Sequence, residues 1–188
     1  MSILLSKIAE DTKKTILTVI KGAGEIGVTL QTAVKDNVVA VLKGVGEITT
    51  AATGVVSEVV QGAIVAVAST GATLTVSSKN VVTGAIKGAL EVGTDSIVAT
   101  QKVVSGAIKG TAEVGGDVAG VAVSAVEGAI ETAKTVGIDT ENVARVAVIT
   151  AVKTADEIGT EAGKSVRKAL LSTASLPKDV VKAALGGK

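Results

Sequence analysis

Apolar and polar residues recur along most of this chain with a period of 11 residues. Eleven residues make three turns at about 3.67 residues per turn, which is close to the natural α-helical value. In each half-unit, numbered from Thr18, positions 2, 6, 9 and 10 lie on one side of such a helix and are mostly small and aliphatic. The opposite side carries charges, as at Lys87 and Glu91, so the pattern predicts amphipathic helices. The predicted apolar contact face, which would meet lipid or another helix, includes Val19, Ile26, Val38, Ala85, Val92, Val104, Ala107 and Val114.

Two half-units form a 22-residue repeat. Gly84-Ala-Ile-Lys-Gly-Ala-Leu-Glu-Val-Gly93 recurs 22 residues later as Gly106-Ala-Ile-Lys-Gly-Thr-Ala-Glu-Val-Gly115. The register holds without insertion from Thr18 to Gly159. A fixed period of this length is typical of repeat architectures, in which each unit packs on its neighbours.

Glycines mark the predicted repeat boundaries. In Gly93-Thr-Asp95 the glycine suits the end of one helix and the aspartate suits the N-cap of the next. This spacing predicts helices of roughly 18–20 residues. Glu91 and Glu113 would then lie in the last turn, against the helix dipole, so a continuous helix is the alternative. The predicted hinges are Gly27, Gly71, Gly93, Gly115, Gly137 and Gly159.

The chain therefore divides into three predicted parts. Residues 1–17 form a helical lead-in, residues 18–171 the 22-residue repeats, and residues 172–188 a capping helix and tail. In the last part, Ser175 is the expected N-cap and Pro177 fits the first turn. The expected fold is all-α, with the repeats elongated or closed into a ring or bundle. The alternative is a β-solenoid with 22-residue coils, because Val, Ile and Thr are abundant, although the Asp caps favour helices.

Small residues on the helices raise the question of what the contact face touches. Glycine costs about 1 kcal/mol relative to alanine in a helix, so the helices must gain stability by burying their apolar side. Gly84/Gly88 and Gly106/Gly110 are GxxxG pairs, which allow close approach of two helices. The partner can be the same chain, another copy or lipid.

The amino-acid composition limits the kinds of catalytic and binding site that we expect. The chain has no His, Cys or aromatic residue, and its 19 basic and 18 acidic residues nearly balance. We therefore expect no metal site, no cofactor and no enzymatic activity, because the usual bases, thiolates and metal ligands are missing. Nucleic acid is not an expected partner, because basic patches and stacking aromatics are missing too. Gly22-Ala-Gly-Glu-Ile-Gly27 matches a dinucleotide-binding pattern, but the repeat explains these glycines better.

The longest uncharged stretch, Val59 to Ser78, approaches the length of a membrane span, but Ser, Thr and Gln dilute it. No signal peptide is evident, since the first apolar run is short and charges follow it at once. We expect a cytoplasmic protein that associates with membranes or lipid.

The segments Val81-Val-Thr-Gly-Ala-Ile-Lys-Gly-Ala-Leu-Glu-Val-Gly93 and Val123-Ser-Ala-Val-Glu-Gly-Ala-Ile-Glu-Thr-Ala133 resemble the amphipathic repeats of synucleins, perilipins and exchangeable apolipoproteins. The likeness lies in period and composition and covers most of the chain. It implies a lipid-surface protein. The sequence hypothesis is thus a lipid- or membrane-associating helical repeat protein that forms homo-oligomers. The alternative is a structural, self-assembling helical bundle or filament without lipid.

Overall fold

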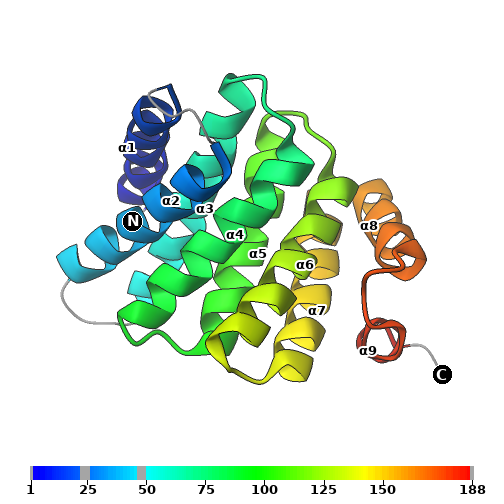
Figure 1. Ribbon diagram of the computed structural model, residues 1–188. Coiled ribbons are helices and arrows are strands. Elements are labelled where there is room, and N and C mark those ends of the chain that lie inside the picture. Colours follow the sequence, from blue (N-terminus) through cyan, green and yellow to red (C-terminus); the bar gives the residue numbers. More distant parts are fainter. Residues whose placement is uncertain (1, 22–25, 46–49, 187–188) are drawn as a thin grey trace.

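The computed structural model describes residues 2–21, 26–45 and 50–186, and these ranges contain helices and turns without a strand. Every long helix is followed by a short connection to the next, and the helices are shorter toward the C-terminus (Figure 1). The described helices are α1 Ser2–Lys21, α2 Ile26–Gly44, α3 Thr50–Ser69, α4 Leu74–Glu91, α5 Ser96–Glu113, α6 Val118–Val136, α7 Thr140–Ile158, α8 Thr160–Ser172 and α9 Lys178–Ala184. The prediction of an all-α repeat is confirmed, and the β-solenoid alternative is wrong.

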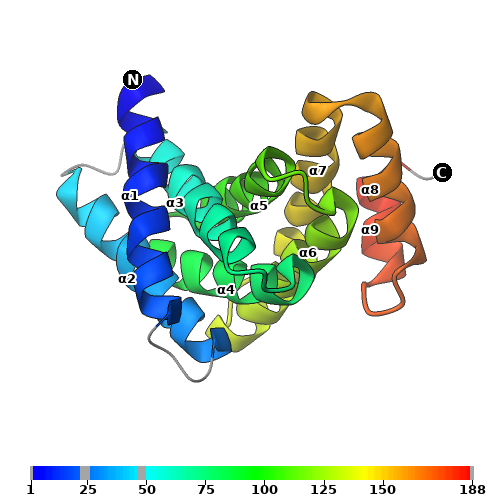
Figure 2. The same cartoon turned by 90° about the horizontal axis from the view of Figure 1, so that it is seen from above.

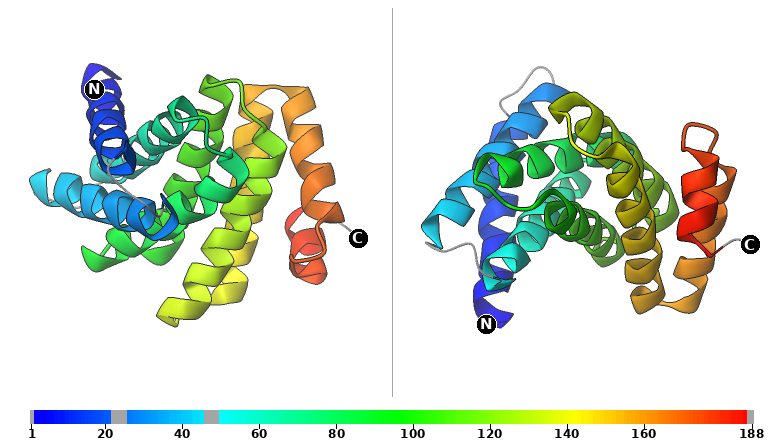
Figure 3. Two further views of the ribbon diagram at one scale, coloured as in Figure 1. Left: turned by 45° about the horizontal axis from the view of Figure 1, so that its top comes forward. Right: turned by 90° about the horizontal axis from the view of Figure 1, so that it is seen from below.

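Helices α1 to α7 each pack most extensively on a helix two places away in the chain. The largest contacts join α2 with α4, α3 with α5, and α1 with α3, whereas consecutive helices touch less. Odd-numbered and even-numbered helices therefore form two layers (Figures 1 and 2). One 22-residue repeat supplies one helix and one turn, so two repeats add one helix to each layer. The array curves, with α5 at the inside of the bend between α3 and α7 (Figures 2 and 3).

The ends of the array take part in this packing. Helix α1 crosses the boundary expected after residue 17 and packs on α3 as the repeats do, so it is the first odd-layer helix. At the other end, α8 follows α6 in the even layer and α9 lies beside α7. The two chain ends lie at opposite ends of the array (Figure 2).

Helix ends in the middle of the chain follow the predicted glycine and aspartate signals. Gly93 has a φ of 85°, a left-handed conformation that glycine adopts without steric cost. The next amide, of Thr94, donates to the Ala89 carbonyl at 3.0 Å and satisfies the end of α4. The Asp95 carboxylate then accepts from the amides of Ile97 at 2.9 Å and Val98 at 3.1 Å, which starts α5. Asp117 and Asp139 cap α6 and α7 by accepting from one amide each, those of Gly120 and Asn142.

Gly71, between α3 and α4, also has a left-handed φ of 77°, but the other expected boundary signals differ from the pattern. Gly27 is the second residue of α2, so it lies in the first turn of this helix. Gly159 connects α7 to α8 with a φ of 167°, which is extended backbone. Thr73 precedes α4 without a side-chain capping bond to the described residues. Helices of 18–20 residues from α1 to α7 confirm the predicted length.

The last helix begins later than predicted. Helix α9 starts at Lys178, so Pro177 precedes it and does not occupy its first turn. Ser175 does not cap the helix, because its hydroxyl donates to the Glu127 carboxylate of α6. This contact and the burial of Leu176 hold the α8–α9 connection against the array.

The core is built from a repeated set of aliphatic side chains. One large aliphatic residue recurs every 22 residues and is buried in each of the seven helices that carry it: Ile20, Leu42, Ile64, Ile86, Ile108, Ile130 and Val152. Alanine and valine fill the space between them. The core is therefore continuous along the array, and no single centre requires an aromatic side chain.

Candidate functional site

The predicted contact face meets other helices of the same chain. Val38, Ala85, Val104 and Ala107 are fully buried within the core. Val92 is half-buried and packs against that core, while Val19 and Val114 are also half-buried. Ile26 begins α2, and its side chain lies outside the described residues. The buried part of the face is therefore an internal interface, because it packs against other helices of the same chain.

The GxxxG glycines make the closest of these contacts. A Cβ atom at Gly84 would collide with the Gln31 carbonyl oxygen of α2, and one at Gly106 would lie 2.5 Å from the Ser57 carbonyl oxygen of α3. Gly62 of α3 meets the Ala9 carbonyl of α1 in the same manner. Each glycine therefore lets its helix lie directly on the backbone of the helix two places earlier.

The charged stripe also joins neighbouring helices of a layer. The Lys35 ammonium of α2 donates to the Glu91 carboxylate of α4 at 2.7 Å, and the Lys79 ammonium pairs with Glu131 of α6 at 2.5 Å. In the odd layer, the Gln61 amide donates to Glu113 at 2.6 Å. The sequence interpretation missed these pairs, because it compared charges three and four residues apart within one helix. The paired residues are 52 or 56 positions apart in the sequence. Such a spacing can be recognised as a contact only when alternate helices are known to be neighbours.

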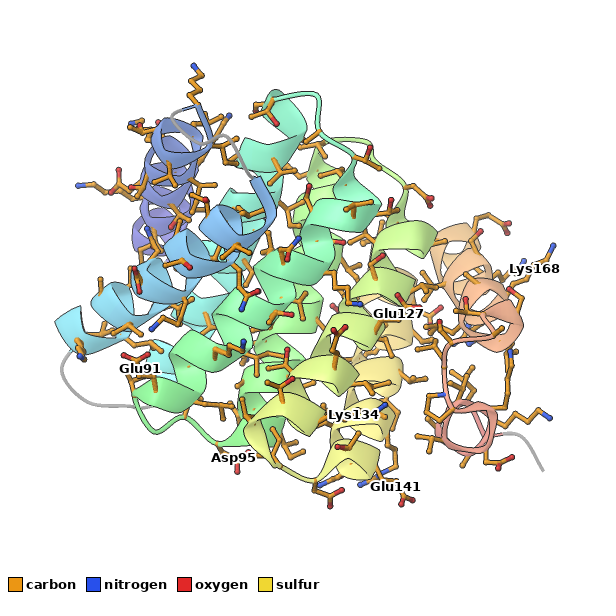
Figure 4. The ribbon with its side chains drawn as sticks, in the orientation of Figure 1. Glu91, Asp95, Glu127, Lys134, Glu141 and Lys168 are labelled. Atoms are coloured by element: carbon orange, nitrogen blue, oxygen red, sulfur yellow. The ribbon has the colours of Figure 1, made fainter. Side chains whose placement is uncertain are left out.

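These pairs shift the acidity of their groups. The hydrogen bond from Lys35 lowers the pKa of Glu91, and the same bond raises the pKa of Lys35. Glu58 on α3 shows the opposite shift, since partial burial raises the pKa of its carboxyl, while nearby Lys109 partly offsets this and Glu113 adds to it. Glu91 is the last residue of α4 and lies at the edge of the array (Figure 4).

A groove lies at the C-terminal end of the array. This C-terminal groove has a volume of about 490 Å³. Its lining residues are Ile149, Val152, Lys153, Asp156 and Glu157 of α7, Arg167 of α8, and Ala184 and Leu185 at the end of α9. The Arg167 guanidinium forms two bonds with the Asp156 carboxylate, at 2.6 Å and 3.2 Å, and so ties α8 to α7.

An apolar residue occupies a surface position in this groove. Ile149 is 42% exposed, although the residues at the same phase two and four repeats earlier are Ser105 and the polar Gln61. Val152, on the next turn, is buried at the groove floor. The groove therefore combines an apolar centre with the charged side chains of Lys153, Asp156, Glu157 and Arg167.

Three features that the sequence raised can be located in the structure. Within residues 2–21, 26–45 and 50–186, no group of three or more His, Cys, Asp or Glu could hold a metal ion. Most of the dinucleotide-like motif, residues 22–25, lies outside the described residues, and Gly27 lies in α2. Val59 to Ser78 is divided between α3 and α4, and no described helix is long and apolar enough to cross a membrane.

These features define a helical repeat protein. The chain is similar in structure to the de novo designed helical repeat protein DHR7, with a TM-score of 0.54 and 20% sequence identity. The match covers 99% of this chain and 97% of the designed one, so the shared fold extends over the whole array. No protein-family model and no curated protein sequence matches the chain.

Proposed function

We propose that the chain is a non-enzymatic helical-repeat scaffold, which folds without lipid and presents its outer surface to a protein partner. The observation that carries this proposal is the burial of the contact face between the two layers. Val38, Ala85, Val104 and Ala107 are each 0% exposed, so the apolar stripe already has its partner. What remains outside is mostly charged and polar, with single exposed aliphatic residues such as Val76 and Ile149. Repeat arrays commonly use such an extended outer surface to bind a protein partner.

Lipid association, which the amphipathic period and the resemblance predict, stays a prediction. It would require the helices to separate, because the side chains that would rest on acyl chains are enclosed by neighbouring helices. Burial of each valine side chain contributes roughly 1.5–3 kcal/mol, and this contribution would first be lost. Homo-oligomerisation also stays a prediction, and the same set of measurements tests it.

The decisive experiment compares helicity in buffer with helicity on vesicles of phosphatidylcholine and phosphatidylglycerol. We expect a strongly helical circular dichroism spectrum with cooperative thermal unfolding in buffer, unchanged by vesicles, and no flotation with them. A chain that is weakly helical in buffer and becomes helical with vesicles would overturn the proposal in favour of lipid association. Sedimentation velocity on the same sample measures the oligomeric state.

A matched pair of variants makes this test specific. Val104→Asp places a charge in the buried face, whereas Val76→Asp changes a valine that is 67% exposed. If the face is an internal core, Val104→Asp loses helicity in plain buffer and Val76→Asp does not, since an unpaired buried carboxylate is strongly destabilising. If the face serves lipid, Val104→Asp keeps its helicity in buffer and changes only the vesicle response.

A further inference from the structure

The N-terminal end of the even layer leaves one side of α2 uncovered. Among the described helices, α2 contacts α1, α3 and α4, so it has a single neighbour within its own layer. Figure 1 shows α2 at the left of the array, with α4 on its other side. The uncovered side, which we call the α2 edge, consists of Ala33, Asp36, Ala40, Lys43 and Gly44. Ala33 is half-buried and the other four residues are exposed.

The same repeat positions are buried in the helices that follow. At steps of 22 residues, Ala40 corresponds to Gly62, Gly84, Gly106 and Gly128, and Gly44 corresponds to Ala66, Gly88, Gly110 and Thr132. All of these residues are buried, and Gly84 and Gly88 lie directly on the backbone of α2. The α2 edge therefore keeps the small residues by which later helices contact a neighbour, although no described helix covers it.

The C-terminal end of the array has a different surface. The outer side of α8 is mostly charged or polar, with Glu161, Lys164, Ser165, Arg167, Lys168, Leu171 and Ser172 exposed. A polar outer face is typical of the capping unit of a repeat protein. In the odd layer, α9 packs on α7 at this end. The small residues of the α2 edge thus have no matching surface at the C-terminal end, and the remaining end-to-end contact joins two N-terminal ends. Such a contact closes with two-fold symmetry.

The charges of the α2 edge are arranged to complement a second copy of themselves. Asp36 and Lys43 are seven residues apart, so they lie on the same side of the helix about two turns from each other, with Ala40 between them. The side chain of Asp36 is 66% exposed, and the Lys35 ammonium 3.7 Å away is held by Glu91 at 2.7 Å. When two α2 edges meet in antiparallel orientation, each Asp36 lies opposite the partner's Lys43. A parallel orientation brings like charges together, so the charges favour the antiparallel pair.

We propose that two copies of this chain associate through their α2 edges, antiparallel about a two-fold axis near Ala40. Ala40 and Gly44 let the two helices approach closely, and the two pairs of Asp36 with the partner's Lys43 flank this contact. The even layers of the two copies thereby become continuous. One helix edge is smaller than a standard interface of about 800 Å² per partner, so we expect a weak dimer with a Kd of about 10–100 µM. This assembly goes beyond the scaffold function proposed above.

The test is sedimentation velocity of the full chain from about 5 to about 500 µM, with the variants Asp36→Lys and Lys43→Asp. Each variant alone places like charges opposite each other, so its dimer should be at least about tenfold weaker than that of the wild type. In an equimolar mixture, the new lysine of one variant faces the new aspartate of the other. We therefore expect the mixture to dimerise about as well as the wild type, which a purely structural role of either residue would not produce.

A second variant tests the close contact. Ala40→Gln places a longer side chain at the centre of the α2 edge, and it should weaken the dimer by at least about tenfold. Because Ala40 is exposed, the circular dichroism spectrum should remain that of the wild type. The matched controls are Lys168→Asp and Ser165→Gln, which change exposed residues of α8 at the other end of the array. Both controls should leave the dimer unchanged.

A wild-type chain that stays monomeric up to about 500 µM would overturn the inference. So would a wild-type dimer whose charge variants do not recover association when they are mixed. Assembly beyond a dimer, or dissociation by Lys168→Asp, would assign the contact to the C-terminal end and refute the proposed geometry. These outcomes do not depend on vesicles or on the helicity measurement in buffer, so they are separate from the test of the scaffold proposal.

Discussion

Two interfaces of the odd layer share one sequence pattern but differ in how closely their helices approach. Helix α5 rests on α3 through Gly106 and Gly110, and these two helices share more extensive contacts than α5 and α7 do. Helix α7 carries Thr150 and Thr154 at the two equivalent positions, 44 residues later. The even layer repeats the trend, since α4 has Gly84 and Gly88 whereas α6 has Gly128 and Thr132, and α4 with α2 shares the more extensive contacts.

The comparison shows that side-chain size at two positions per helix sets the spacing of the layer. A Cβ at Gly106 would lie 2.5 Å from the Ser57 carbonyl oxygen, whereas one at Gly128 would lie 3.2 Å from the Lys79 carbonyl oxygen. Where threonine replaces glycine, its hydroxyl bonds within its own helix, as Thr132 does to the Gly128 carbonyl at 2.6 Å. Such a side chain is accommodated by a wider spacing of the helices.

The largest expected effect comes from filling the close contact. Gly106→Ala should destabilise the array by roughly 1–3 kcal/mol, because the new methyl group forces α5 away from the α3 backbone. The control is Gly54→Ala in α3, whose Cβ meets nothing within 4 Å among the described residues. That change should stabilise by roughly 0.5–1 kcal/mol through helix propensity. Urea unfolding measures both, and equal effects of the two variants would refute the role of glycine in spacing.

The next largest effect on stability is expected at the glycines of the turns, where two connections between helices can be compared. Gly93 has a φ of 85°, so Gly93→Ala should cost about 1–2 kcal/mol through strain in the left-handed conformation. Gly159, in the α7–α8 connection, has a φ of 167°, which alanine also adopts. Gly159→Ala should therefore change the free energy of unfolding little. Thermal or urea unfolding of both variants tests this difference, and a cost at Gly159 similar to that at Gly93 would contradict it.

Helix caps should show a smaller contrast. Asp95→Ala removes a carboxylate that accepts from two amides at the start of α5, so we expect a loss of about 1 kcal/mol. Thr73 precedes α4 without a capping bond from its side chain to the described residues, and Thr73→Ala should have no measurable effect on unfolding. The outcome that would contradict the assignment is a loss at Thr73 as large as that at Asp95.

The smallest effects are those of pH, and two carboxylates of the array should respond with opposite sign. The pKa of Glu91 is lowered by Lys35, so its contribution to stability is present above the ordinary value of 4.5 and is lost as the pH falls through the lower folded value. The pKa of Glu58 is raised by burial, so its contribution is present below 4.5 and is lost as the pH rises through the higher folded value.

Unfolding measured from about pH 3 to about pH 8 separates the two groups. Glu91→Gln should reduce the loss of stability in acid, and Glu58→Gln should remove the loss that follows ionisation of that carboxyl. At high pH, Lys35 adds a further loss as the pH rises through its raised pKa, since its contribution is present below 10.5. Identical pH profiles of the two glutamate variants would refute the assigned shifts.

Much of the fold follows from local sequence signals. The 11-residue period predicts the helices, and Gly93 followed by Asp95 predicts where one helix ends and the next begins, because both are local backbone requirements. The same reasoning predicts a hinge at Gly27, and the structure places this residue in the first turn of α2, one residue after the helix begins. It also predicts the start of the last helix too early, with Ser175 as the N-cap and Pro177 in the first turn, whereas α9 begins at Lys178. The Ser175 hydroxyl instead bonds to Glu127 of α6, which is distant in sequence.

The candidate site was less accessible to sequence reasoning. Ile149 is a single apolar residue on the polar side of its predicted helix, and the sequence alone gives no reason to distinguish it from other variable surface positions. Its place in the C-terminal groove becomes visible only in the structure, because α9 has only seven residues and leaves part of the α7 surface uncovered. Lys153, Asp156 and Arg167 likewise acquire their relation from the packing of α7 on α8.

The sequence by itself determined the helices, their length, their turns and the apolar stripe, because each of these depends on residues within about one repeat. Only the tertiary structure decided what the stripe touches. An amphipathic helix can cover lipid, another copy or its own neighbours at similar gain in free energy, and the period alone does not distinguish them. The glycines that let alternate helices stack backbone against backbone bring the stripe into an internal core, and this contact joins residues about 50 positions apart.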